Sequence, residues 1–297
     1  FLEQQATEFQ GPSPAGSSRF DTQSILLFHS GEKEHFALAL PLIRRIEKFA
    51  MSRVEIVGKK EFVTIEGAST LILRLDRHLS VSPCVESEDM FLILPKFIQK
   101  PFGILMSNII DIEETIIDLN TDSYMEDGLL GTDIIRDHLT LFPDIYRLIE
   151  LAEPRWFAER RRIAPPPEER KKVIVAEDSA FLRQMVYKYL ESDQYEVQLA
   201  ENGKAALEMM EKTPFDLLVS DIDMPVMNGF DLIKAVRHHR RLRDIPAMAL
   251  TSLRTEQDKR RAMEAGFDEY QVKIDRERFL SEVARLVRGR HSPRVEG

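Results

Sequence analysis

Residues 216–229 of the chain read Asp216-Leu-Leu-Val-Ser-Asp221-Ile-Asp-Met-Pro225-Val-Met-Asn-Gly229. The aliphatic run 217–220 predicts a short buried strand, and Pro225 and Asn228-Gly229 predict a turn directly after it. In an open α/β sheet, ligands bind in the crevice beyond the carboxyl ends of the strands. Asp221 lies at that position, so it is either a residue that caps a turn or a residue that takes part in a reaction. The residues expected to lie near it distinguish these two possibilities.

Strand and helix patterns alternate on both sides of this stretch. We expect strands at 173–176, 197–200, 217–220, 247–250 and 270–272, and helices after Ser179 and at 204–212, 230–238, 255–265 and 277–288. The helix after Ser179 carries one apolar face, formed by Leu182, Met185, Val186, Tyr189 and Leu190. Five successive strand–helix units predict an α/β fold with a five-stranded, doubly wound parallel sheet of the flavodoxin type.

Polar residues follow four of these expected strands. They are Glu177-Asp178-Ser179 after the first, Asp221 and Asp223 after the third, Thr251-Ser252 after the fourth and Lys273 after the fifth. In a strand order 2-1-3-4-5 the carboxylates of Glu177, Asp178 and Asp221 converge in one crevice. Three neighbouring carboxylates repel one another unless a hard divalent cation lies among them, and an oxygen-only ligand set favours Mg²⁺.

Each of these residues has a simpler explanation when taken alone. An acidic pair offsets a helix dipole, a threonine caps a helix, and a lysine lies on the surface. Together they match what phosphoryl transfer needs, because a carboxylate nucleophile, a metal site, a hydroxyl donor and a cation would meet at one edge.

Residues from about 171 to 290 resemble a two-component receiver domain in the acidic pair, the Ser-Asp-Ile-Asp-Met-Pro-Val-Met-Asn-Gly run, Thr251-Ser252 and Lys273. The resemblance implies that Asp221 accepts a phosphoryl group from a phosphohistidine, with Thr251 and Lys273 at the same site. It also implies an Mg²⁺ site formed by Asp178 and Asp221, by Glu177 through water and by the backbone carbonyl of Asp223. Thr251 and Tyr270 match the pair that switches conformation, although Tyr270 could equally be a tyrosine that packs at the sheet edge.

The chain departs from this family at one position. The family lysine is usually followed by a cis proline, whereas Lys273 is followed by Ile274. A cis bond before a residue other than proline costs about 2.5–4 kcal/mol, so we expect a less tightly held lysine. Slower phosphorylation and an inert receiver are both compatible with this difference, and we favour an active one.

The first half of the chain has a different pattern. Residues 1–22 are expected to be a linker, and short strands punctuated by glycines follow them. The expected strands are 25–29, 36–40, 43–49, 62–66, 71–76, 90–97, 104–107, 109–119, 129–135 and 139–142, and a closing helix is expected at 144–152. Strands at this spacing predict an all-β antiparallel barrel or sandwich.

No catalytic constellation is visible in this half. His29, His35, His78 and His138 lack metal-like spacing, and Cys84 lacks an activating partner. Residues 24–156 resemble the CheW-like domain in Gln23–Phe28, in Phe36–Ile46 and in Leu139–Leu148. The resemblance implies a double barrel that binds CheW-like coupling proteins and chemoreceptor cytoplasmic tips.

Composition limits the alternatives. Residues 1–150 contain 14 Lys and Arg against 24 Asp and Glu, a net charge of −10, which argues against nucleic acid as a partner. The longest apolar runs are far shorter than the roughly 20 residues of a membrane span. The chain has one cysteine, so we expect a cytoplasmic protein without disulfides or cysteine metal sites.

We therefore expect a CheW-like coupling domain at 23–153, a Pro/Arg-rich linker at 154–171, a receiver domain at 172–290 and a tail at 291–297. Phe1 is not an initiator, and this favours the C-terminal portion of a hybrid CheA histidine kinase. The alternatives are a CheV-type adaptor and an adaptor with an inert receiver. A DNA-binding regulator is disfavoured, since its only support is Arg237-His-His-Arg-Arg241. No kinase catalytic domain is recognisable in the chain, so enzymatic activity beyond the receiver's own phosphotransfer and autodephosphorylation would lie upstream.

Overall fold

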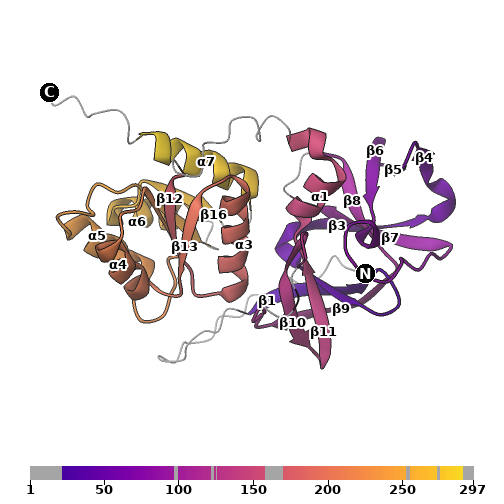
Figure 1. Cartoon of the computed structure of the whole chain (residues 1–297), viewed down its shortest axis with the longest axis horizontal. Coiled ribbons are helices and arrows are strands. Elements are labelled where there is room, and N and C mark those ends of the chain that lie inside the picture. The colour runs from indigo at the N-terminus through magenta and orange to yellow at the C-terminus, as the bar shows by residue number, and fades with distance from the viewer. Residues whose placement is uncertain are drawn as a thin grey trace.

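The computed structural model describes residues 22–96, 100–121, 124, 126–157, 170–251, 255–272 and 275–289. An all-β domain and an α/β domain lie side by side, and helix α3 lies at their junction (Figure 1). The expected tail at 291–297 and most of the two expected linkers fall outside the described residues.

The all-β domain contains two sheets. The first has the order β10 (Leu129–Ile135), β11 (His138–Pro143), β2 (His35–Ala39), β1 (Gln23–His29) and β9 (Asn108–Thr115). The second has the order β3 (Ile43–Ala50), β7 (Asp89–Pro95), β8 (Phe102–Met106), β6 (Ala68–Leu73), β5 (Lys60–Ile65) and β4 (Glu55–Val57). Three short 3₁₀ turns, η1 (Leu40–Leu42), η2 (Met51–Arg53) and η3 (Leu75–Arg77), join strands. The expected all-β fold class is confirmed.

Several details differ from the sequence-based expectation. Two pairs, β2 with β11 and β6 with β8, are parallel, so the domain is not purely antiparallel. Strand β4 was not expected, because its three residues are all exposed and carry no alternating apolar pattern. An isolated bridge between Asn120 and Thr132 joins the segment after β9 to β10, the opposite edge strand of the first sheet. That bridge brings the two edges together, as a barrel requires.

Helix α1 (Ile145–Ala152) closes this domain where the sequence predicts it. The Asp144 side chain caps the helix by accepting a hydrogen bond from the Arg147 backbone N–H at 3.1 Å. The 3₁₀ turn η4 (Pro154–Phe157) follows, and its Trp156 packs against the hydrophobic core with the Lys100 ammonium 5.8 Å from the ring centre. The turn therefore keeps the end of the domain against its own core.

The α/β domain has the parallel strand order β13 (Glu196–Ala200), β12 (Lys172–Ala176), β14 (Leu217–Ser220), β15 (Ala247–Thr251) and β16 (Glu269–Val272). Helices α3 (Ala180–Ser192) and α7 (Arg276–Gly289) share one hydrophobic core with one face of this sheet. Helices α4 (Gly203–Lys212), α5 (Gly229–His238) and α6 (Glu256–Ala265) cover the other face. The predicted order 2-1-3-4-5 is confirmed.

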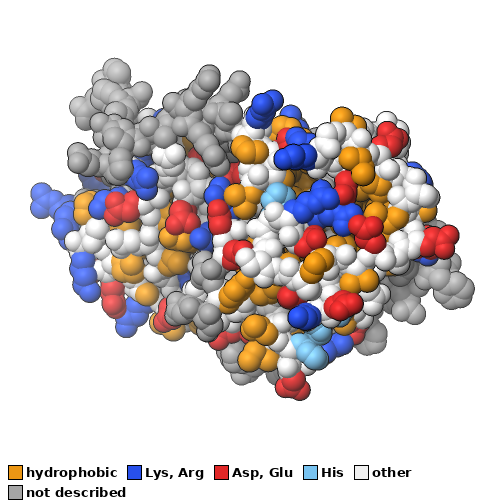
Figure 2. Space-filling model, turned by 45° about the vertical axis from the view of Figure 1, so that its right-hand side comes forward, with side chains coloured by type: hydrophobic (Ala, Val, Ile, Leu, Met, Phe, Trp, Pro, Cys, Tyr) orange, Lys and Arg blue, Asp and Glu red, His pale blue; other side chains and the backbone are white. Residues whose placement is uncertain are grey.

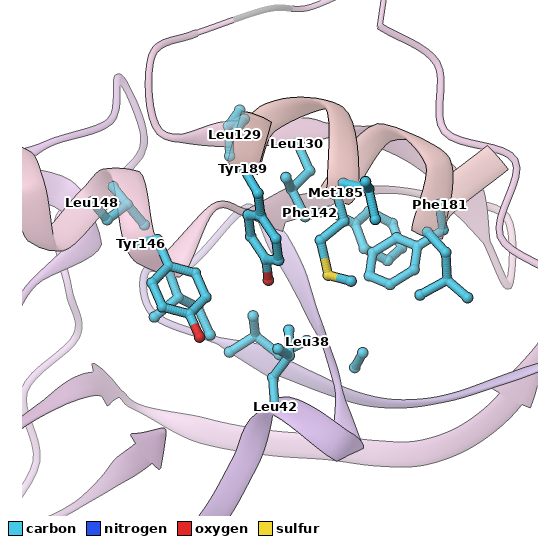
Figure 3. Packing of buried hydrophobic residues seen from close by; sticks show 14 of the residues in the cluster. Leu38, Leu42, Leu129, Leu130, Phe142, Tyr146, Leu148, Phe181, Met185 and Tyr189 are labelled. Atoms are coloured by element: carbon cyan, nitrogen blue, oxygen red, sulfur yellow. The ribbon is translucent and has the colours of Figure 1, made fainter. Parts of the chain in front are cut away.

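Helix α3 packs against both domains. The Phe181 ring lies 5.9 Å from the Phe142 ring of β11, and the Tyr189 ring lies 5.3 Å from the Tyr146 ring of α1. Figure 3 shows these pairs with Met185 between them, on the side of α3 that faces the all-β domain. One hydrophobic cluster therefore runs from the first sheet through α3 into the α/β domain.

None of the described helices is long and apolar enough to cross a membrane.

We predict that Phe142→Ala lowers the free energy of unfolding by about 3–5 kcal/mol, because Phe142 is 1% exposed and supports the junction. Urea denaturation followed by circular dichroism measures the change. Ile134→Ala, on the neighbouring strand but 68% exposed, serves as the control and is expected to cost less than about 0.5 kcal/mol. Equal losses for the two variants would contradict the packing described here.

Candidate functional site

Three carboxylates gather at the carboxyl ends of β12 and β14. One oxygen each from Glu177, Asp178 and Asp221 lies within 4.8 Å of the others. Glu177 is fully buried, Asp221 is 5% exposed and Asp178 is half-buried. The neighbouring strands β12 and β14 are paired in register through Ala176 and Ser220, which brings the residues that follow them to the same edge of the sheet.

The backbone around Asp221 fixes the position of its side chain. The Asp221 N–H donates to the carbonyl of Ala176 at 2.8 Å, and the Ile222 N–H donates to Asp221 Oδ1 at 2.7 Å. The Gly229 N–H donates to the carbonyl of Ile222 at 2.8 Å. A Cβ atom on Gly229 would lie 2.1 Å from the Asp221 carbonyl oxygen, so only glycine allows the turn to close this tightly.

The acidic pair is held by its own loop and by helix α3. The Ser179 N–H lies 3.0 Å from Asp178 Oδ1 and 3.3 Å from Glu177 Oε1. Arg183, one turn into α3, donates through Nη1 to the backbone carbonyls of Glu177 at 2.6 Å and Asp178 at 3.0 Å. These two hydrogen bonds hold the backbone of the loop that carries the two acids.

The donor set of this cluster fits a hard divalent cation. All three ligand atoms are carboxylate oxygens, and Mg²⁺ prefers oxygen ligands. Three buried or half-buried carboxylates at this separation repel one another strongly in the absence of a positive charge. The side chain of Asp223 is exposed, two residues beyond Asp221.

Thr251 and Tyr270 lie on the neighbouring strands β15 and β16. Thr251, 1% exposed, ends β15 and is paired with Val272 of β16. Tyr270 is 6% exposed and belongs to the hydrophobic core under α4, α5 and α6, and burial raises the pKa of its hydroxyl. The tyrosine is therefore in a packed, inward position. Ser252, Lys273 and Ile274 lie outside the described residues.

Comparison with known proteins identifies the family of the α/β domain. The response regulator receiver domain family matches residues 173–284. The two-component response regulator ORR3 of Oryza sativa is 32% identical over 111 residues, which cover 37% of this chain and 82% of that protein. The chain belongs to the response regulator receiver family. It is therefore part of two-component phosphorelay signalling.

Two further matches are, by name, a sensor histidine kinase and a chemotaxis response regulator. The sensor histidine kinase CheAY of Helicobacter pylori is 23% identical over 268 residues, or 86% of this chain, and the chain spans only 33% of that kinase. The chemotaxis response regulator CheY4 of Vibrio cholerae has a solved structure that is 35% identical. That match covers 39% of this chain and 98% of CheY4, with a TM-score of 0.38.

Outside the receiver domain, the structure brings together histidines that the sequence left apart. His29 and His35 are direct partners across β1 and β2, with ring centres 4.6 Å apart. His138 of β11 stacks on His35 at 4.3 Å. Burial and the neighbouring imidazoles lower the pKa of His35, which favours its neutral form. Only the strand pairing reveals this cluster, because its members are 6 and 103 positions apart in the sequence.

These histidines do not form a second metal-like site. Among the described residues, the acidic cluster is the one group of three or more His, Cys, Asp or Glu side chains whose ligand atoms lie within 4.8 Å of one another. Cys84 is half-buried, and burial raises the pKa of its thiol, which disfavours the reactive thiolate. The chemistry of the described residues is therefore concentrated in the receiver domain.

We predict that Gly229→Ala lowers the free energy of unfolding of the receiver domain by about 1–3 kcal/mol, because the new methyl group collides with the Asp221 carbonyl. Thermal denaturation measures the effect. Gly289→Ala is the matched control, since a Cβ at Gly289 meets nothing within 4 Å. A Gly229→Ala variant as stable as the control variant would argue against the close approach.

Proposed function

We propose that Asp221 accepts a phosphoryl group from a phosphohistidine of a histidine kinase or of its phosphohistidine domain. In this step an Asp221 carboxylate oxygen forms a bond to phosphorus while the phosphorus–nitrogen bond to the donor histidine breaks, and the electron pair returns to the imidazole. The observation that carries the proposal is the convergence of Glu177, Asp178 and Asp221 at the strand ends. A carboxylate at such an edge is reachable by a partner and is a known nucleophile for phosphoryl transfer.

The other residues of the site receive supporting roles. Asp178 and Asp221 would hold Mg²⁺ directly, Glu177 through water and Asp223 through its backbone carbonyl. A bound Mg²⁺ supplies the positive charge that offsets the carboxylates and the phosphoryl oxygens. The Thr251 hydroxyl donates to the incoming phosphoryl group and Lys273 pairs with it, while Thr251 and Tyr270 form the switch that responds to phosphorylation.

For the all-β domain, we propose a CheW-like coupling role, in a domain spanning 23–153 beside a receiver at 172–290. It would dock to CheW-like coupling proteins and to chemoreceptor cytoplasmic tips. The two-sheet all-β architecture is consistent with this assignment. The similarity to a sensor histidine kinase along 86% of the chain favours the C-terminal portion of a hybrid CheA kinase over a CheV-type adaptor. Kinase activity would then belong to other parts of such a protein.

A different class of function is an adaptor whose receiver is inert. It is favoured by one feature, the isoleucine that follows Lys273 where the family usually has proline. In that case the receiver would serve as a binding domain only, and no phosphorylated form of Asp221 would accumulate with any donor. The measurement described below separates the two functions directly.

Within the basic run Arg237–Arg241, Arg237 makes structural contacts inside the receiver domain. Arg237 donates to the backbone carbonyls of Ile245 at 2.6 Å, Gly266 at 2.8 Å and Arg243 at 2.9 Å, and pairs with Asp268 at 2.7 Å. On the face shown in Figure 2, acidic and basic side chains are interspersed. The expectation that nucleic acid is not a partner stays a prediction.

We predict that the protein gains one phosphoryl mass when incubated with Mg²⁺ and a small phosphodonor such as acetyl phosphate, and that Asp221→Asn abolishes this gain. Intact-protein mass spectrometry measures it. Asp223→Asn is the matched control, because it changes the adjacent exposed carboxylate and keeps the backbone carbonyl. An unlabelled wild-type protein would favour the inert adaptor.

We predict that chelation of Mg²⁺ with EDTA stops labelling, and that Asp178→Asn weakens Mg²⁺ binding by at least about tenfold, as expected when a charged ligand is lost at the metal. The Mg²⁺ concentration that gives half-maximal labelling reports the affinity. Asp193→Asn, an acidic residue at the opposite end of α3, is expected to leave that concentration unchanged. An unchanged Mg²⁺ requirement in Asp178→Asn would remove this residue from the metal site.

A further inference from the structure

A cavity of about 580 Å³ lies at the junction of the two domains. The all-β domain lines it with the segment just before β10 and with α1, and the receiver lines it with α3 and the start of α7. All of the lining residues belong to the part of the chain that the structure describes. The volume is in the range of protein pockets that take small organic molecules.

One wall of the cavity is aromatic and apolar. Tyr146 of α1 and Tyr189 of α3 both line it, with ring centres 5.3 Å apart and an angle of 83° between the rings (Figure 3). The two tyrosines are 6% and 4% exposed, and Leu129, 2% exposed, lines the same cavity. Aromatic rings in this arrangement offer surface both to the apolar part of a ligand and to a positive charge.

The cations of the lining already have partners. Arg147 Nε and Nη2 each lie 2.6 Å from an oxygen of Asp127. Arg276, 3% exposed, donates through Nη2 to Glu150 Oε1 at 3.2 Å and to Ser192 Oγ at 2.5 Å. The third cation, Lys188, pairs with Glu191 at 3.1 Å. An anionic ligand would therefore have to compete with carboxylates of the protein for every positive charge in the lining.

The acids of the lining outnumber its cations by five to three. Of the two that form no ion pair within the described residues, Glu126 accepts hydrogen bonds from the Ser80 N–H at 2.9 Å, the Ser80 hydroxyl at 2.8 Å and the Tyr124 hydroxyl at 2.8 Å. The other is Asp144, whose Oδ1 accepts the helix-capping bond from the Arg147 N–H. The excess of acids thus leaves the negative charge of Asp144 without a partner.

Asp144 is therefore the polar group of the cavity that a ligand can satisfy. It is 7% exposed, and its Oδ2 accepts no hydrogen bond from the described residues. Burial raises the pKa of its carboxyl, as expected where no cation compensates the charge. A buried carboxylate is stable when it is paired and hydrogen-bonded, and an ammonium group provides both a positive charge and N–H donors.

We propose that this cavity binds a small organic amine, whose ammonium group pairs with Asp144 and whose apolar body packs against Tyr146 and Tyr189. Such a ligand touches α1 of the all-β domain and α3 of the receiver at once, and so it holds the two domains together. The inference does not depend on the phosphorylation of Asp221.

The test measures binding of phenethylamine, an ammonium group on an aromatic body, to the full chain. We expect one equivalent to bind saturably by isothermal titration calorimetry and to raise the midpoint of thermal unfolding, because the ligand binds the folded state. The comparison ligand is 2-phenylethanol, which has nearly the same shape and no charge. We expect it to bind at least about tenfold more weakly, since it lacks the charge-assisted contact.

Asp144→Asn is expected to weaken binding of phenethylamine by at least about tenfold. Asparagine caps a helix as well as aspartate does, so the variant removes the charge and keeps the start of α1. Asp231→Asn is the matched control, because it makes the same change in the first turn of α5, on the far side of the receiver sheet. Its affinity for phenethylamine is expected to equal that of the wild type.

Each result bears on this site alone. A wild-type protein that does not bind phenethylamine overturns the inference, and so does equal affinity for the amine and the alcohol. Unchanged binding in Asp144→Asn, shown to be folded by circular dichroism, removes Asp144 from the site and overturns it as well. Labelling of Asp221 is measured separately, so failure of the proposed function and failure of this inference are distinguishable.

Discussion

Helix α3 buries apolar side chains against two surfaces at the same time, the all-β domain and the receiver's own sheet. The arrangement of both domains follows from this constraint. Phe181, Met185 and Tyr189 recur every four residues and face the all-β domain (Figure 3). Leu182, Val186 and Leu190 form the adjacent row, about 100° around the helix, which leaves them for the receiver's own sheet. A helix buried on two sides has little freedom to rotate or slide, so the loop that precedes it is equally fixed. That loop carries Glu177 and Asp178.

At the other end of this loop, negatively charged side chains lie close together although their charges repel one another. Strand pairing between β12 and β14 brings Glu177, Asp178 and Asp221 to one edge, and backbone hydrogen bonds hold Asp221 in place. Electrostatic repulsion opposes this cluster, and the packing of α3 and the close turn at Gly229 maintain it. Favourable packing around the site thus offsets the electrostatic repulsion among its carboxylates, as is common at functional sites.

The receiver half was predictable from sequence because its signals are local. Each strand end, the apolar face of α3 and the start of that helix after Ser179 can be read from a few consecutive residues. The all-β half depends on pairings between distant segments, so the parallel pairs β2–β11 and β6–β8 and the stacked histidines left no local pattern. Arg276 was missed for the same reason: in sequence it is the first residue of an amphipathic helix, and its partners Glu150 of α1 and Ser192 of α3 are distant in the chain. Tyr189 was assigned to a single apolar face, whereas it belongs to the row that crosses the domain boundary.

The position of Trp156 has a practical consequence. It is the only tryptophan in the chain, and it stands in the turn η4 at the point where the all-β domain ends. Its ring packs on the same hydrophobic cluster that continues through α3 into the receiver, with the Lys100 ammonium close to the ring. Indole emission depends on the polarity around the ring and on nearby charge. The protein therefore carries an intrinsic optical probe where the all-β domain ends, and a change in packing there can be followed by fluorescence without any attached dye.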